Sequence, residues 1–194
     1  MENYTEKKLT IDLKKANIYS LKILLYSCVV FLVPYILLWQ YQFSFEHLSS
    51  TFKRLIEKYT FLSGFIPLFF MVLGIVLHEL IHGLTFLPFC KNGFKSIQFG
   101  FLKQYLTPYC HCKEPLKLKY YRIGVIMPAI ILGFLPAIWA ITIGNFYLLC
   151  FGIFFTMGAA GDFMILMILK NENPEDLVLD HPSEAGCFVY TAKE

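Results

Sequence analysis

The chain has 194 residues, of which 57% are hydrophobic and 16% charged, and its formal net charge is +3. Soluble domains carry roughly 25% charged residues, and a chain this short cannot bury so much apolar surface in its own interior. The composition therefore excludes an ordinary water-soluble domain and predicts a membrane protein. Nucleic-acid binding is not expected either, because the lysines punctuate apolar segments and form no basic face.

Stretches without charged residues predict four membrane-spanning helices, since about 20 apolar residues cross the hydrocarbon core. The predicted helices cover residues 22–41, 61–87, 122–142 and 146–169. The last two share one uncharged stretch, Ile123–Gly161, which is too long for a single crossing and which Gly144-Asn145 divides as a turn. Prolines within these helices are expected to kink them: Pro34, Pro67, Pro128 and Pro136. The predicted fold is an all-α membrane protein of about four helices, forming a single domain over residues 1–194.

The segment before the first predicted helix carries charges, and the apolar stretch after it is too long for a signal peptide, so no cleavable leader is expected. Six cysteines are present, but their spacing is unlike a disulfide framework. Cys28 and Cys150 lie inside apolar stretches, and we expect reduced thiols.

The connecting segments also carry patterns. In the first loop, apolar residues at helical spacing predict a short helix on the outer surface: Leu48, Phe52, Leu55, Ile56 and Tyr59. In the second loop, Ile97, Phe99 and Phe101 alternate with other residues, so residues 94–110 are expected to form a β-hairpin near the cytoplasmic face. The tail from Asn171 is polar and acidic, and it is expected to be a short cytosolic extension with one strand at Cys187–Tyr190.

The distribution of basic residues predicts the orientation, because loops rich in Lys and Arg stay in the cytoplasm. Five lysines lie at or before the start of the first predicted helix, and six lie between the second and third helices. The loop between the first two helices has three basic residues, offset by Glu46 and Glu57. We therefore expect a multi-pass protein of the cell membrane with both termini in the cytoplasm.

The second predicted helix contains the motif His78-Glu79-Leu80-Ile81-His82. Residues four positions apart lie on the same face of a helix, so His78 and His82 can bind one zinc ion. Glu79 lies about 100° around the helix from His78 and can deprotonate a water that the zinc activates. Ionisable residues are costly inside a membrane and usually mark function, which favours a catalytic zinc over polar residues at a helix end.

A third ligand is expected from Asp162 in the fourth predicted helix. It follows a stretch of small residues, Gly158-Ala159-Ala160-Gly161, which we expect to let another helix approach closely. With 1.5 Å rise per residue, Asp162 and the two histidines fall at similar depths in the inner half of the membrane. The alternative is a buried carboxylate that bonds a neighbouring hydroxyl.

Other candidates remain open. Cys110-His111-Cys112 is interpreted as a cluster at the site entrance, with a second metal site as the alternative. Glu114 and Asp180 are alternative third ligands. Residues that could stabilise an oxyanion are Tyr105, Tyr109 and Arg122. His47 and His181 are expected to be solvated.

These motifs resemble a bacterial family described as putative zincin peptidases, over roughly residues 60–190. The resemblance rests on the histidine motif followed by Gly83, on Met127-Pro128, on Gly161-Asp162 and on Asp180-His181-Pro182. More distantly, the layout is similar to the site-2 class of intramembrane metalloproteases, which implies His78, His82 and Asp162 as metal ligands and Glu79 as the catalytic residue. That class has an Asn where this chain has Ile131, and its aspartate precedes a glycine.

The resulting hypothesis is a zinc-dependent, membrane-embedded peptidase. Its expected cofactor is Zn²⁺, and its expected partners are a peptide or membrane-protein substrate and the lipid bilayer. The alternative is a zinc-binding scaffold or carrier without hydrolytic activity. Glu79 argues against that alternative, because a purely structural zinc site fills its fourth position with a ligand.

Overall fold

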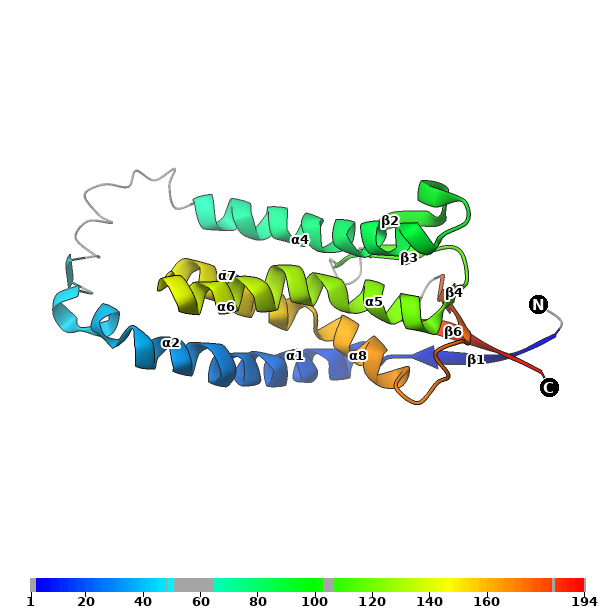
Figure 1. The fold of residues 1–194 in the computed structure, drawn as a ribbon, viewed down its shortest axis with the longest axis horizontal. Helices are drawn as coiled ribbons and strands as arrows, with labels where there is room; N and C mark the ends of the chain where they lie inside the picture. The colour runs from blue at the N-terminus through cyan, green and yellow to red at the C-terminus, as the bar shows by residue number, and fades with distance from the viewer. Residues whose placement is uncertain (1–2, 48, 51–64, 103–106, 183, 194) are drawn as a thin grey trace.

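The computed structural model describes residues 3–47, 49–50, 65–102, 107–182 and 184–193. Long helices run side by side along the longest axis of the molecule, and a small β-sheet covers one end of the bundle (Figure 1). Both chain termini lie at the end that carries the sheet. The termini share one end, as an even number of crossings requires.

Four helical stretches among the described residues are long and apolar enough to cross a membrane, in agreement with the predicted multi-pass protein. They cover Lys15–Leu38, Phe65–Phe89, Leu118–Ile143 and Phe146–Ile168. The first stretch begins seven residues before the predicted start at residue 22.

Each stretch is built from shorter elements. The first contains α1 (Leu13–Ser27), a π-helical turn (Cys28–Leu32), α2 (Val33–Leu38) and a 3₁₀ turn (Gln40–Phe43). The second is α4 (Phe65–Phe86) with a 3₁₀ turn (Leu87–Phe89), followed in the loop by another at Gly93–Ser96. The third contains α5 (Leu118–Pro128), a π-helical turn (Ala129–Phe134) and α6 (Leu135–Ile143). The fourth contains α7 (Phe146–Gly158) and α8 (Ala160–Ile168).

Three of the four prolines expected to kink the helices lie beside the π-helical turns, whereas Pro67 lies in the first turn of α4, where a helix tolerates proline. Pro34 follows the π-helical turn of the first stretch, and Pro128 and Pro136 flank that of the third. Proline lacks a backbone N–H and its ring clashes with the carbonyl four residues before it, which forces a wider turn. The predicted turn at Gly144-Asn145 is also confirmed. Gly144 has φ +70°, and the Asn145 side chain accepts a hydrogen bond from the Leu148 N–H, which caps α7.

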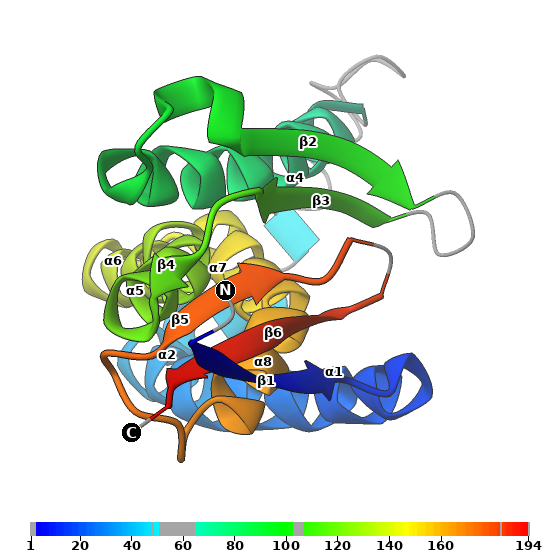
Figure 2. The same cartoon turned by 90° about the vertical axis from the view of Figure 1, so that its right-hand side faces the viewer.

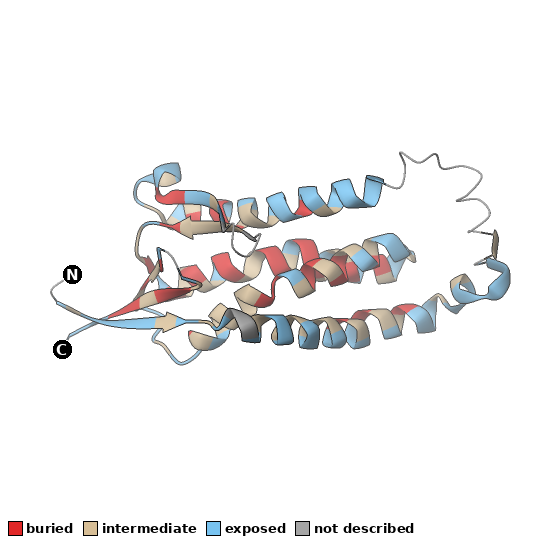
Figure 3. Ribbon diagram, turned by 180° about the vertical axis from the view of Figure 1, so that it is seen from behind, coloured by how far each residue is buried: buried red, intermediate tan, exposed pale blue. Residues whose placement is uncertain are grey.

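The third and fourth stretches form the centre of the bundle. Buried residues concentrate there, whereas α1 and α4 are largely exposed on their outer sides (Figure 3). Glycines bring the two central stretches into contact. A Cβ atom at Gly152 would lie 2.6 Å from the Ala137 backbone nitrogen, and one at Gly133 would lie 2.5 Å from Thr156 Oγ1. Close backbone approach of this kind is how apolar helices associate in a membrane.

The predicted bundle of about four helices is confirmed, but the fold is not purely α-helical, because strands from both ends of the chain and the short β4 form a four-stranded antiparallel sheet in the order β1-β6-β5-β4 (Figure 2). Its strands are β1 (Tyr4–Thr10), β4 (Leu116–Lys117), β5 (Leu177–Asp180) and β6 (Gly186–Ala192). The tail strand predicted at Cys187–Tyr190 is confirmed within β6. Strand β1 escaped prediction because its pattern is mostly polar and its partner lies at the other end of the chain, where Tyr4 pairs with Ala192.

The predicted hairpin is confirmed as β2 (Ile97–Leu102) paired with β3 (Thr107–Cys112), in a register that aligns Ile97 with Cys112. It packs against the carboxyl-terminal part of α4, where a Cβ atom at Gly83 would lie 2.7 Å from Phe99 Cζ and 3.1 Å from Ile97 Cγ2. The helix predicted from the apolar residues between Leu48 and Tyr59 lies mostly outside the described residues.

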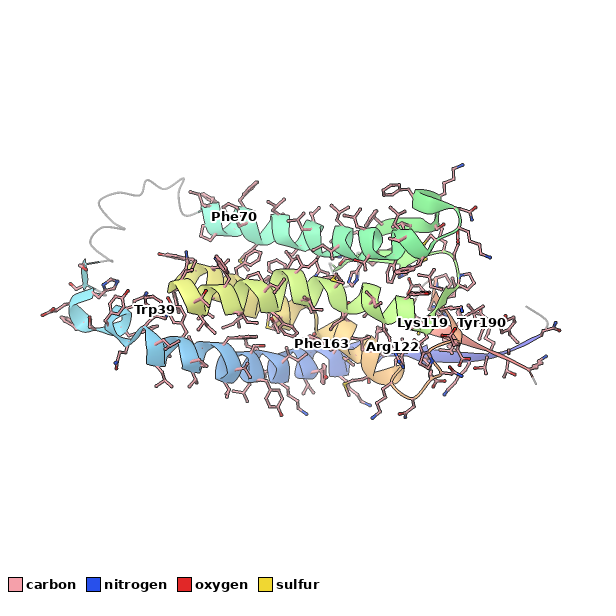
Figure 4. All side chains as sticks on the ribbon, in the orientation of Figure 1. Trp39, Phe70, Lys119, Arg122, Phe163 and Tyr190 are labelled. Carbon is pink, nitrogen blue, oxygen red and sulfur yellow. The ribbon has the colours of Figure 1, made fainter. Side chains whose placement is uncertain are left out.

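Polar and aromatic side chains distinguish the two ends of the bundle. Lys119 and Arg122 lie near the end that carries the sheet, and Trp39 lies at the opposite end (Figure 4). The Trp39 indole N–H donates to the carbonyl of Ile141 at 2.8 Å. Indole rings favour the membrane–water boundary, so Trp39 supports the assignment of this end to one membrane surface.

Candidate metal centre

Helix α4 places His78 and His82 one turn apart with their ring centroids 4.9 Å from each other. Both rings face Asp162 of α8. His78 Nε2 lies 3.1 Å from Asp162 Oδ2, and His82 Nε2 lies 3.3 Å from Asp162 Oδ1. The three residues form the group of potential metal ligands found among the described residues, with donor atoms within 4.8 Å of one another.

The donor geometry fits zinc. Zinc takes imidazole nitrogens and carboxylate oxygens at about 2.0–2.1 Å in a tetrahedral arrangement, which places its ligands roughly 3.3 Å from one another. The distances of 3.1 and 3.3 Å between the Nε2 atoms and the carboxylate oxygens are of this size. Three protein ligands leave one coordination position for water or substrate, which is typical of a catalytic site.

A break in the fourth stretch brings Asp162 to the histidines. Helix α7 ends at Gly158, Ala159 adopts ψ 12°, and α8 begins at Ala160, so Asp162 falls in the first turn of a new helix. The break therefore turns the Asp162 carboxylate toward His78 and His82 of α4.

A backbone carbonyl fixes the tautomer of His82. The Nδ1 atom of His82 lies 2.9 Å from the carbonyl oxygen of Gly124 in α5, and since a carbonyl can only accept, Nδ1–H is the donor. This leaves the Nε2 lone pair directed at the Asp162 side. Gly124 is required here because a Cβ atom would lie 2.1 Å from Phe86 Cε1. Sequence reasoning missed this contact, since a carbonyl acceptor leaves no residue-type signature.

Glu79 is held by the hairpin. Its carboxylate accepts a hydrogen bond from the backbone N–H of Cys110 in β3. Glu79 also lines the cavity that contains His78, His82 and Asp162. A general base must lie within hydrogen-bonding reach of the proton that it removes, and this contact orients the carboxylate beside the cluster.

The cavity has a volume of about 270 Å³ and gives water access to the cluster. The side chains of His78, His82 and Asp162 are 12%, 8% and 18% exposed, so they are largely but not completely covered. The walls of the cavity come from α4, α5 and α8, from Pro108 to His111 of β3, and from the residues Asp180, Pro182 and Glu184–Gly186, with Ile11 beside them.

The small residues before Asp162 serve a different purpose from the one predicted. Ala159 and Ala160 are buried, but a Cβ atom at Gly158 or Gly161 would meet nothing within 4 Å. Both glycines line the cavity. They therefore keep space open beside the metal cluster and do not bring another helix into close contact.

Asp180 joins three elements next to the cavity. Its Oδ1 accepts a hydrogen bond of 2.5 Å from the Tyr121 hydroxyl of α5, and its Oδ2 accepts one of 2.7 Å from the Cys112 backbone N–H of β3. Burial raises the pKa of the Asp180 carboxyl, against the opposing effect of these two donors. Asp180 therefore lies beside the metal cluster but outside its donor set, and the alternative of Asp180 as third ligand is not supported.

The cysteine–histidine cluster lies where the sequence interpretation placed it, since Cys110 and His111 line the cavity. Burial lowers the pKa of His111, so its imidazole is neutral at pH 7. Burial also raises the pKa of the Cys112 thiol to about 12, and its Sγ lies 3.5 Å from Cys90 Sγ. Among the described residues, the group that could hold a metal ion does not include these cysteines.

The remaining candidates lie away from the cluster or are engaged elsewhere. Glu114 accepts hydrogen bonds from the Lys91 and Asn92 N–H groups and from the Ser96 hydroxyl, so it organises a loop and is not a third ligand. The Arg122 guanidinium donates to the carbonyls of Leu169 and Glu172, and Arg122 is not among the residues that line the cavity, so it is not placed to stabilise an oxyanion there.

The two lone histidines differ from each other. His47 is exposed as predicted, but the prediction of a solvated His181 is wrong. His181 is 7% exposed, because its ring packs against Phe188 and its Nδ1 accepts from the Glu184 N–H. Tyr109 lines the cavity, and Tyr105 lies outside the described residues.

Comparison with known proteins agrees with this geometry. No curated protein and no solved structure matches the chain. Residues 71–177, more than half of the sequence, match the family described as putative zincin peptidase. The matched region contains the histidine motif of α4, the hairpin and Asp162, and it ends before Asp180. The chain belongs to the putative zincin peptidase family.

Proposed function

We propose that the protein is a zinc-dependent peptidase of the membrane, which cleaves a peptide bond near the cytoplasmic surface in the manner of site-2 proteases. The observation that carries the proposal is the position of Glu79 beside the cluster of His78, His82 and Asp162, within a cavity that water can enter. A structural zinc site would need neither an unligated carboxylate nor a cavity.

The basic residues at the sheet end support a cytoplasmic location for the site and for both termini. Lys7, Lys8, Lys117, Lys119 and Lys170 all belong to elements at this end of the bundle. Basic residues near the ends of spans stay on the cytoplasmic side. The metal cluster then lies in the inner half of the membrane, close to the cytosolic sheet.

His78, His82 and Asp162 would hold the zinc. When bound there, zinc polarises a carbonyl oxygen and lowers the pKa of a water to about 7. Glu79 accepts a proton from the attacking water as the new C–O bond forms. It then delivers that proton to the leaving nitrogen as the C–N bond breaks. The Cys110 N–H keeps the Glu79 carboxylate in place during both transfers.

Strand β3 supports binding of an extended peptide. One edge of β3 pairs with β2, and the N–H groups of Cys110 and Cys112 point to the other edge, toward Glu79 and Asp180. In an antiparallel strand the N–H and C=O of one residue face the same edge, so the Cys110 carbonyl also faces the cavity. Both of these N–H groups are engaged and Pro108 has none, so an extended substrate would bind this edge by donating its own N–H groups to the carbonyls there. A helix would first have to unwind.

The test compares Glu79→Gln with wild type, using a pool of transmembrane peptides in lipid nanodiscs and mass spectrometry of the products. We expect wild type to cleave in a zinc-dependent way, and Glu79→Gln to lose roughly 10²–10⁴-fold in rate while zinc stays bound. Glu175→Gln is the matched control, because Glu175 pairs with Lys117 and Lys119 on the surface. Equal cleavage by Glu79→Gln with zinc bound contradicts the proposal and favours a zinc-binding scaffold or carrier.

A further inference from the structure

Two N–H groups on the same edge of β3 are held by two different carboxylates. Cys110 N–H donates to Glu79 of α4, and Cys112 N–H donates to Asp180 Oδ2 at 2.7 Å. Residues two positions apart in a strand direct their N–H groups to the same side. The contact at Cys112 therefore constrains where the Cys110 N–H points.

A side chain of α5 also holds Asp180. Its other oxygen accepts from the Tyr121 hydroxyl of α5, at 2.5 Å. Tyr121 is 4% exposed and its ring stacks on Phe86 of α4, with centroids 5.4 Å apart. The Asp180 carboxylate thus connects β3 to the transmembrane helix that also holds His82 through Gly124.

We propose that Asp180 is a positioning residue, which anchors β3 at Cys112 and thereby sets the Cys110 N–H that orients Glu79. The inference rests on the proposed function, because it assigns Glu79 a catalytic role. Asp180 is the last residue of β5, outside the region that matches the family, so the tail of this chain contributes to the site.

The position needs a side chain that can accept a hydrogen bond. Both neighbours of Asp180 donate, and the Cys112 N–H, unlike the Tyr121 hydroxyl, cannot act as an acceptor. Asn can replace Asp, since its carbonyl oxygen accepts from Cys112 N–H while its amide donates to the Tyr121 oxygen, which can also accept. Leu has a similar size but offers neither contact. Comparing Asp180→Asn with Asp180→Leu therefore separates positioning from negative charge.

The first experiment measures hydrogen–deuterium exchange of β3 amides in the full-length protein in detergent, which requires no substrate. We expect the Cys110 and Cys112 amides to exchange roughly tenfold to a hundredfold faster in Asp180→Leu, because a hydrogen bond to a charged group is lost. Asp180→Asn should stay close to wild type. Asp176→Leu is the control, because Asp176 lies in the same sheet region but accepts from Thr191.

The second experiment measures cleavage per bound zinc for the same variants. Asp180→Leu should keep its zinc and lose roughly tenfold to a hundredfold in kcat/KM, with Asp180→Asn retaining most activity. Loss of zinc in Asp180→Leu would overturn the inference, since Asp180 would then act on the metal. Unchanged exchange and kcat/KM would overturn it too, as would an Asn variant as impaired as Leu.

Further results distinguish failure of the positioning role from failure of the proposed function. If Asp180→Leu fails to fold, Asp180→Ser is judged by the same criteria, because its shorter side chain cannot span both donors. If Glu79→Gln is fully active, the proposed function fails while the exchange data still report on β3. If Glu79→Gln is inactive and Asp180→Leu matches wild type in both measurements, only the positioning role fails.

Discussion

The half of the bundle farthest from the sheet and the half nearest to it differ in how they use glycine. In the far half, Gly152 of α7 touches the backbone of the third stretch, and the surrounding residues form an apolar cluster around Tyr35 and Leu149. In the near half, Gly158 of the same helix meets nothing within 4 Å of a built Cβ and borders the cavity. Glycine allows close helix packing in the far half and leaves open space in the near half.

Glycines in a membrane helix can therefore have opposite structural roles. Gly152 removes atoms so that two backbones can touch, which stabilises the bundle. Gly158 and Gly161 leave open space in the cavity beside Asp162. The distinction depends on what lies opposite each glycine, and this is set by the break between α7 and α8.

The largest effect is expected from filling the cavity. Gly158→Leu should lower kcat/KM by roughly a hundredfold, because displacing a substrate by about 1 Å already costs that much. Zinc content and thermal stability should stay near wild type, since the new side chain occupies open space. Peptide cleavage and metal analysis on the same preparation check this. A destabilised protein would show that Gly158 is a packing residue like Gly152.

A smaller effect is expected at the carbonyl that orients His82. Gly124→Ala forces Phe86 aside, because the new Cβ would lie 2.1 Å from its ring, and this shifts the partner of His82 Nδ1. Loss of such an outer hydrogen bond typically lowers metal affinity by about 10–100-fold. Competition with a zinc chelator measures the change. Unchanged affinity in Gly124→Ala would contradict the role given to its carbonyl.

The same substitution at two positions of α7 sharpens the comparison further. Gly152→Ala should destabilise the protein by about 1–3 kcal/mol through overpacking against Ala137. Gly158→Ala should stabilise it by up to about 1 kcal/mol, because alanine favours the helix and meets no neighbour. Denaturation in mixed detergent micelles gives both values. Shifts of the same sign would remove the distinction between the two glycines.

The smallest effect concerns Glu114, which stabilises a loop at the sheet end. Hydrogen bonds from Ser96, Lys91 and Asn92 lower its pKa from 4.5 to about 2. The stability that it contributes is therefore present above about pH 4.5 and is lost as the pH falls toward 2. Glu114→Gln should lose less thermal stability than wild type between about pH 6 and about pH 3. An identical loss in both proteins would show that the hydrogen bonds do not favour the ionised form.

The sequence could predict the cluster because its chemistry resides in side chains at helical spacing. His78 and His82 share a helix face once α4 forms. An acidic residue such as Asp162 is costly in an apolar stretch, so its presence there indicated a functional role. The hairpin was predictable for a similar reason, since the alternation of Ile97, Phe99 and Phe101 is local. The structure brings all of these together.

The rest depends on contacts that residue types do not encode. The Gly124 carbonyl and the Cys110 and Cys112 N–H groups belong to the backbone, which every residue has. The pairing of β1 with β6 joins distant segments, and β1 is mostly polar. His181 is polar but buried, because it packs on Phe188 in a sheet that could not be foreseen.

The pairing of β1 with β6 has a consequence for how the protein is made. Strand β1 is synthesised first, but its partner emerges only after all four apolar stretches, so it waits without a neighbour during membrane insertion. Pairing between such distant segments is slow to form. Asp180 and the turn after it arrive at the same late stage, so the histidine motif already lies in the membrane before the strand that orients Glu79 is anchored. Under the proposed function, the peptidase site is therefore completed only after β5 has been synthesised.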